Sequence, residues 1–307
     1  MDTNRPYLPE GYVPSSPLSS AQITQAFDAQ TIVSARPNRC DTQHNLHFQL
    51  GAVTGIMSPN QVSAPWVSGA GRDIALLSRV GKETCFHVES LTTDDAGHTV
   101  AQLSRKSVQE QAMTHLLSTL AVGDVLPAVV THLASFAAFV DIGCGIVALM
   151  PISCSGVSRI VHPKDRFTVG QNLKVVVTAF DKDTRRITVS HKELLGSWME
   201  NASYFSAGDT VQGVVRSVKP YGCFIELTPN LSGLTDVTDG IQVGDWVSVY
   251  IKSIRPEVMK IKLQIIQTIP TPPEGIPIRY AITDGHIENW QYAPPNYVGD
   301  TVKSQLI

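Results

Sequence analysis

Leu126-Pro-Ala-Val-Val-Thr-His-Leu-Ala-Ser-Phe-Ala-Ala-Phe-Val-Asp-Ile142 recurs later in the chain as Val211-Gln-Gly-Val-Val-Arg-Ser-Val-Lys-Pro-Tyr-Gly-Cys-Phe-Ile-Glu-Leu227. Both stretches are rich in β-branched and aromatic residues, and each follows a Gly-Asp pair that begins at Gly123 or Gly208. A stretch that is repeated at a fixed period is the signature of a module used more than once. The sequence therefore predicts at least two copies of one β-rich unit.

The two copies keep a constant offset of 85 residues over their first half, where Phe139 matches Phe224 and Leu149 matches Leu234. From the Val-Gly turn onward the offset is 74, so the later copy lacks 11 residues (85 minus 74). The deletion falls where the earlier copy holds the polar segment 153–166. A deletion confined to one segment indicates a surface loop.

Short strands are expected throughout both copies, because runs of β-branched residues alternate with Gly, Pro and Asp. In the earlier copy they cover residues 125–131, 138–142, 146–150, 173–180 and 186–190. Five short strands in about 70 residues are typical of a small closed barrel. We therefore predict a mostly β protein of tandem five-stranded barrels joined by short helices.

A third, degenerate copy precedes the two clear ones, because Leu46-His-Phe-Gln-Leu-Gly51 imitates residues 138–143, with His47 in the place of Phe139. The expected layout is a flexible arm (1–22), the degenerate barrel (23–106), a linker helix (107–120), a barrel (121–192), a second linker helix (193–206), a barrel with a shortened loop (207–267), and a Pro-rich joint with an aromatic tail (268–307). Ser107-Val-Gln-Glu110 reads as the capping box of the first linker helix.

Composition is that of a soluble globular protein, with 43% apolar and 17% charged residues and a net charge of −3. The chain lacks the basic excess of a protein that holds nucleic acid mainly by neutralising phosphates, although residues 155–195 carry eight Lys or Arg against four Asp or Glu. No signal peptide and no membrane span are expected. Five cysteines without a Cys-x-x-Cys pair fit reduced thiols in a cytoplasm.

The pattern that carries function is Phe136-x-x-Phe139, repeated as Tyr221-x-x-Phe224. Small residues between the two aromatics permit a bend that would put both rings on one side of the strand. Two rings on one outer face would stack on unpaired bases, at about 1–3 kcal/mol per base. The alternative is that the rings are ordinary core residues, but their recurrence at one spacing favours exposure.

Basic side chains near these aromatics are candidate phosphate contacts, each weighed against an ordinary solvated surface charge. They are Lys219 and Arg216 before the later pair, Arg186 and Lys260 at equivalent positions of the last strand, and Arg159, Lys164 and Arg166 as a mobile basic rim in the long loop.

These linked motifs resemble the RNA-binding domain named after small-subunit ribosomal protein S1, an oligonucleotide-binding (OB) barrel, over about residues 23–267. The layout is also similar to that of short S1-like proteins of low-GC Gram-positive bacteria. The resemblance implies that Phe136, Phe139, Tyr221 and Phe224 face single-stranded RNA. It also implies a role in mRNA binding at the small ribosomal subunit. Pro151 and Asp236 stand where the family often has a histidine, which predicts weak or selective affinity for single modules.

Two other functions stay open. Cys40, His44, His47, Cys85 and His87 suggest a metal-dependent enzyme, but their spacing matches no zinc motif and no catalytic motif is present. The other is an adaptor that docks on the ribosome or an RNA-decay machine and has lost RNA affinity. The expectation is a non-catalytic RNA-binding protein without cofactor, metal or small-molecule substrate.

Overall fold

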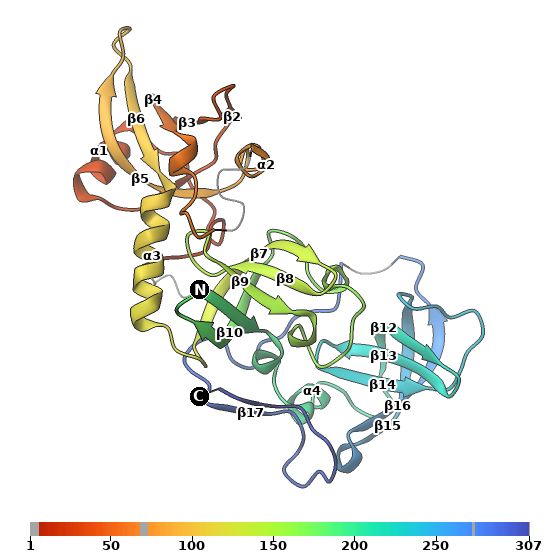
Figure 1. Cartoon of the computed structure of the whole chain (residues 1–307). Helices are drawn as coiled ribbons and strands as arrows, with labels where there is room; N and C mark the ends of the chain where they lie inside the picture. Colours follow the sequence, from red (N-terminus) through yellow and green to blue (C-terminus); the bar gives the residue numbers. More distant parts are fainter. Residues whose placement is uncertain (1–5, 68–72, 272–273, 307) are drawn as a thin grey trace. The chain divides into compact units, whose positions relative to one another are not determined.

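Strands dominate the structure, a computed structural model that describes residues 6–67, 73–271 and 274–306 (Figure 1). The chain separates into two compact units. One consists of Met1–Leu120, Pro127–Thr131 and Val140–Ala148, and the other of Ala121–Leu126, His132–Phe139 and Leu149–Ile307. Within the described ranges, no helix is long and apolar enough to cross a lipid bilayer.

The first copy forms a six-stranded sheet in the order β1-β5-β6-β4-β3-β2. Its elements are α1 (Ser20–Ala29), β1 (Val33–Ala35), β2 (Arg39–Cys40), β3 (Leu46–Leu50), β4 (Val53–Met57), η1 (Pro59–Gln61), α2 (Asp73–Leu77), β5 (Thr84–Thr93) and β6 (Thr99–Ser104). Its core includes Phe48 and Phe86, whose ring centroids lie 5.2 Å apart. In the part of the chain that is described, this degenerate copy is thus a half-barrel and not a closed one.

Each of the two later copies closes into a five-stranded barrel. The second barrel consists of β7 (Val125–Ala134), β8 (Ala137–Asp141), β9 (Val147–Pro151), β10 (Asn172–Asp181) and β11 (Arg186–Ser190), with the 3-10 turns η2 (Ile152–Cys154) and η3 (Pro163–Asp165). The third consists of β12 (Thr210–Lys219), β13 (Gly222–Thr228), β14 (Leu231–Thr235), β15 (Trp246–Arg255) and β16 (Lys260–Thr268), with η5 (Pro256–Val258). The predicted mostly β fold with tandem five-stranded barrels is confirmed.

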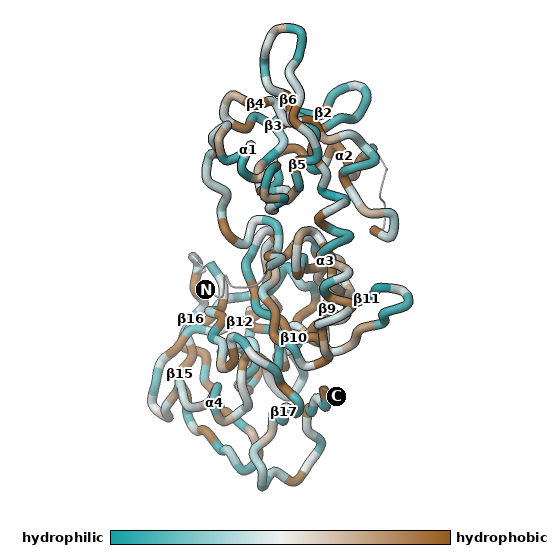
Figure 2. Tube along the Cα trace, turned by 90° about the vertical axis from the view of Figure 1, so that its left-hand side faces the viewer, coloured by the Kyte–Doolittle hydropathy of each residue, from teal (hydrophilic) through white to brown (hydrophobic). Residues whose placement is uncertain are grey.

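Strand pairing shows that the two sequence offsets are structural equivalences. Leu149 pairs with Thr188 between the parallel strands β9 and β11, and Leu234 pairs with Lys262 between β14 and β16. These pairs are related by 85 residues on one strand and 74 on the other. Figure 2 shows hydrophobic residues along the barrel strands and hydrophilic ones at turns such as the one between β5 and β6.

The linker helices differ in detail from the expected ones. The first, α3 (Arg105–Thr119), begins two residues early because Ser104, in extended conformation, caps it by accepting from the Ser107 backbone N–H. Ser107 is therefore inside the helix and is not its cap. The second linker is not one helix: η4 (Lys192–Leu195) and α4 (Trp198–Ala202) are separated at Gly196, whose φ of 80° ends the first turn.

The N-terminal arm is packed from residue 6 onward, which corrects the expectation of a flexible segment. Glu10 is buried and forms ion pairs with Arg79 and Arg105. Burial alone would raise the pKa of the Glu10 carboxyl, but the two guanidiniums outweigh it and lower that pKa to about 2. A buried ionised carboxylate needs such partners, and they fix the arm on the first unit. Residues 1–5 lie outside the described residues.

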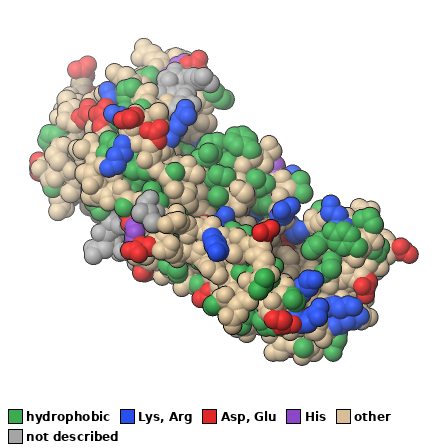
Figure 3. Space-filling model, turned by 60° about the horizontal axis from the view of Figure 1, so that its bottom comes forward, with side chains coloured by type: hydrophobic (Ala, Val, Ile, Leu, Met, Phe, Trp, Pro, Cys, Tyr) green, Lys and Arg blue, Asp and Glu red, His purple; other side chains and the backbone are tan. Residues whose placement is uncertain are grey.

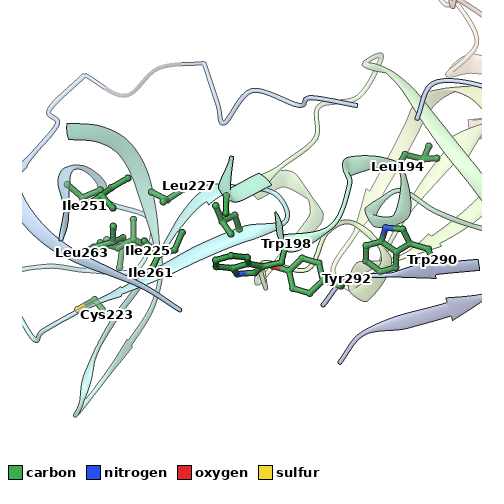
Figure 4. Close-up of a cluster of buried hydrophobic side chains, with 14 of the residues drawn as sticks. Leu194, Trp198, Cys223, Ile225, Leu227, Ile251, Ile261, Leu263, Trp290 and Tyr292 are labelled. Atoms are coloured by element: carbon green, nitrogen blue, oxygen red, sulfur yellow. The ribbon is translucent and has the colours of Figure 1, made fainter. Parts of the chain in front are cut away.

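The C-terminal tail packs on the third copy through its aromatic residues. Trp290 and Tyr292, on and beside β17 (Asn289–Gln291), share a buried cluster with Trp198 and with barrel residues such as Ile225 (Figure 4). β17 pairs with β18 (Lys303–Gln305). The tail therefore completes a hydrophobic core instead of trailing from the barrel.

Candidate nucleic-acid interface

The second barrel exposes an aromatic pair where β7 turns into β8. Phe136 lies in the turn with 61% of its surface exposed, and Phe139 on β8 is half-buried. Their ring centroids are 6.2 Å apart, and the ring planes meet at 88°. The pair presents one ring to solvent and supports it with the second.

The third barrel repeats this arrangement between β12 and β13. Tyr221 is 68% exposed, Phe224 is half-buried, and their ring centroids lie 6.3 Å apart at 89°. Edge-to-face contact of this kind is a favoured geometry for aromatic rings. All four aromatic residues therefore lie outside the buried cores, in one geometry that occurs twice.

Local backbone geometry explains why both rings of a pair share one side. The first ring belongs to the turn and only the second to the strand, so the strict alternation of strand faces does not separate them. The residues between them must be small. Ala137 and Ala138 are fully buried, and Gly222 has φ 151° with no room for a side chain, since a Cβ would lie 2.3 Å from the Thr235 carbonyl oxygen.

A groove of about 580 Å³ adjoins the aromatic pair of the third barrel and is lined by Phe224, Leu234 and three exposed cations. The cations are Arg255, Lys260 and Lys262. Arg255 pairs with Lys260 across β15 and β16, which brings their side chains to one end of the barrel. Asp236 is the acidic residue among those lining the groove. Figure 3 shows Lys and Arg side chains beside exposed hydrophobic ones on the surface that includes this barrel.

The corresponding end of the second barrel carries less positive charge. Arg186 pairs across β10 and β11 with Asp181, which occupies the position of Arg255 in the third barrel. Arg186 lies close enough to contribute to the lowered pKa of Asp181, whose main cause is hydrogen bonding from Thr184. The two barrels thus share aromatic pairs but differ in charge.

Among the other predicted phosphate contacts, the structure separates exposed side chains from buried ones. Lys219, Arg159 and Lys164 are exposed, and Lys219 lies two residues before Tyr221. Arg166 and Arg216 are instead buried, with side chains 4% and 13% exposed, and both pair with the fully buried Glu226. Burial lowers the pKa of Arg166, and Glu226 opposes that shift. The prediction of Arg166 in a mobile basic rim is therefore wrong, because Glu226 requires a counter-charge.

Three residues of this surface were missed by the sequence reasoning. Arg255 and Lys262 belong to the groove, and the exposed His132 places its ring 5.7 Å from that of Phe139. Both cations lie on strands that flank the equivalent of a predicted residue, so a strand-pairing argument from Lys260 would have found them. His132 has no such signal, because its equivalent in the third barrel is Ser217.

The Cys and His side chains considered as a metal site have other partners. His47 Nε2 lies 2.8 Å from Asp41 Oδ2, and His87 Nδ1 lies 3.2 Å from Ser107 Oγ. Across the ranges that the structure describes, no group of three or more His, Cys, Asp or Glu is placed to hold a metal ion. All five cysteines are free thiols.

Comparison with known proteins agrees with this geometry. Residues 119–192 match the family model of the S1 RNA binding domain. The chain is 30% identical over 220 residues to small ribosomal subunit protein bS1 of Staphylococcus aureus (strain COL), covering 66% of this chain and 56% of the relative. It is 33% identical over 179 residues to bS1 of Leuconostoc lactis, covering 53% and 42%. The chain thus spans about half the length of these relatives.

A solved structure, a multidomain protein with nucleic acid binding domains from Streptococcus pneumoniae, aligns at a TM-score of 0.25 and 12% identity, over 77% of this chain and 73% of the other. The family match covers the second barrel, and the same repeat continues into the third. The chain is therefore an S1-domain protein that is built from tandem OB-fold barrels.

Proposed function

We propose that this protein binds single-stranded RNA without catalysing a reaction, and that it holds mRNA at the small ribosomal subunit in the cytoplasm during translation. The observation that carries the proposal is the exposed aromatic pair that recurs in one geometry on two tandem barrels. The relatives named above are small ribosomal subunit proteins, which supports the ribosomal setting.

Single-stranded RNA fits this surface better than a duplex does. An exposed ring can stack only on a base whose face is free, and the bases of a duplex already stack on one another. The three cations of the groove lie beside Phe224, where the backbone of a stacked nucleotide would pass. Stacking and phosphate contact make and break no covalent bond, which supports a binding role.

We expect a labelled single-stranded oligomer to bind the full chain at least about 30-fold more tightly than the same sequence as a duplex. Two stacked bases at the lower value of about 1 kcal/mol each account for that factor. Fluorescence anisotropy at a fixed salt concentration measures both affinities. Equal affinities, or a preference for the duplex, would refute the proposal.

Sedimentation of the tagged protein through a ribosome gradient tests the setting. Movement with the small subunit is expected. If the protein moves with the subunit but does not bind any single-stranded oligomer, the adaptor function is the correct one.

A further inference from the structure

The loop that distinguishes the second copy from the third packs on the third barrel. We call residues 153–167 the docking loop. The docking loop, the third barrel and the segment that carries Phe136 and Phe139 belong to one compact unit, so the contacts described here are internal to it.

A buried ion cluster forms the centre of this contact. Glu226 on β13 is fully buried, and its two carboxylate oxygens accept from Arg166 of the docking loop and from Arg216 of β12. Arg166 Nη2 also donates to the Ser158 carbonyl oxygen (3.1 Å), and Arg216 Nη2 donates to that of Asp165 (3.1 Å). The two guanidiniums thus join the loop and the barrel through one carboxylate.

Hydrogen bonds extend the contact to the turn between β13 and β14. The Ser158 backbone N–H donates to the Pro229 carbonyl oxygen (3.0 Å), and its hydroxyl lies 2.7 Å from that of Ser232. The Val157 backbone N–H donates to Asn230 Oδ1 (3.0 Å). The packing leaves no room at Gly156, where a Cβ would lie 2.3 Å from Arg166 Nη1 and 2.5 Å from the Pro229 carbonyl oxygen.

The linker holds the same turn from its other side. Asn230 Nδ2 donates to the carbonyl oxygens of Lys192 (2.8 Å) and Gly196 (2.9 Å). Two segments that follow the second barrel in sequence therefore meet at one turn of the third.

This contact suits positioning better than it suits stability. A buried ion pair often adds no net stability compared with apolar side chains, yet it enforces one geometry because each charge requires its partner. Arg166 Nε and Nη1 have no hydrogen-bond partner among the described residues, which is a further cost that an apolar contact would avoid. The 11-residue deletion in the third copy is consistent with this, because no further copy of the repeat follows it.

We propose that the docking loop is a positioning element: through Arg166 and Glu226 it holds the two barrels in one arrangement, so that a single RNA strand meets two aromatic pairs whose separation is set before binding. This inference rests on the proposed function. A strand long enough to reach both pairs gains from the fixed separation, whereas a short strand that fills one barrel gains nothing.

The test compares Gly156→Ala and Glu226→Gln with Val161→Ala, a control in the same loop whose side chain is 74% exposed. Affinities are measured for oligomers of about 5 and about 25 nucleotides, lengths that fit one OB barrel and both. Hydrogen exchange of the full chain reports protection at residues 153–167 and 228–232 and in the barrel strands. We expect both variants to lose protection at the contact, to bind the long oligomer about tenfold more weakly, and to bind the short one unchanged.

Three outcomes would overturn the inference. Contact protection that survives in both variants would remove its structural basis. Loss of protection with unchanged long-oligomer affinity would show that the contact does not position RNA sites. Equal weakening of both oligomers, with the barrel strands still protected, would assign the residues to binding itself. If the unmodified chain binds neither oligomer, the proposed function fails first.

Discussion

Replacing Phe136 and Tyr221 together with alanine is expected to weaken the binding of single-stranded RNA by about 10³-fold. Each exposed ring accounts for about 1–3 kcal/mol of stacking, so the loss of both costs about 4 kcal/mol, and each 1.4 kcal/mol is a factor of ten. Both rings are more than half exposed, at 61% and 68%, so their removal leaves the barrel cores intact. Anisotropy titration of the double variant measures the effect.

Tyr250→Ala is the matched control, because it removes an exposed aromatic residue of the third barrel that does not line the groove. Its affinity should equal that of the unmodified chain, and the thermal unfolding midpoints of all three proteins should agree closely. A double variant that is folded and binds RNA with unchanged affinity would show that the rings do not stack on bases.

Replacing Arg255, Lys260 and Lys262 with glutamine is expected to lower the affinity about 100-fold at 0.1 M salt. For single-stranded nucleic acid, the logarithm of the affinity falls with that of the salt concentration at a slope of about 0.7 per neutralised phosphate. Three lost contacts reduce the slope by about 2, which is about 100-fold at 0.1 M relative to 1 M. A salt series on both proteins measures the two slopes.

A second triple variant, with Arg39, Lys82 and Lys303 changed to glutamine, removes the same charge from exposed positions outside the groove. Its salt slope should stay close to that of the unmodified chain. If both triple variants lose the same affinity and slope, the effect comes from total charge and not from the groove.

The repeat made the barrels and the aromatic pairs predictable from the sequence. A pattern that occurs twice at a constant offset excludes most chance readings, and the observed strand partners of Leu149 and Leu234 keep that offset. The T-shaped contact of each pair follows from the turn that precedes β8 and β13, which the spacing alone indicated only as a bend.

The charged residues were less predictable, because their roles depend on partners far away in the sequence. Arg166 lies 60 residues before Glu226, and only the folded chain brings them together. One signal was present: Asp141 and Glu226 occupy the same repeat position inside apolar strands, and both are buried. Asp141 accepts from the backbone N–H groups of Glu10, Gly143 and Gly145, whereas Glu226 uses two arginines. A buried acid at a repeated position should have prompted a search for its cation.

The N-terminal arm and the linkers were mispredicted for a similar reason. Pro- and Ser-rich composition indicated mobility, but one residue, Glu10, joins the arm to two buried arginines. At the first linker, Ser104 and Ser107 are both acceptable caps by residue type. The end of β6 decides between them, because it already holds Ser104 in an extended conformation.

Photo-crosslinking tests the stacking surface most directly. The full chain is irradiated with a single-stranded RNA that carries 4-thiouridine at every uridine position, and the crosslinked peptides are identified by mass spectrometry. Crosslinks are expected on the peptides that contain Phe136 and Phe139 and on those that contain Tyr221 and Phe224. Crosslinks confined to the first copy or to the C-terminal tail, with none at either aromatic pair, would contradict the account.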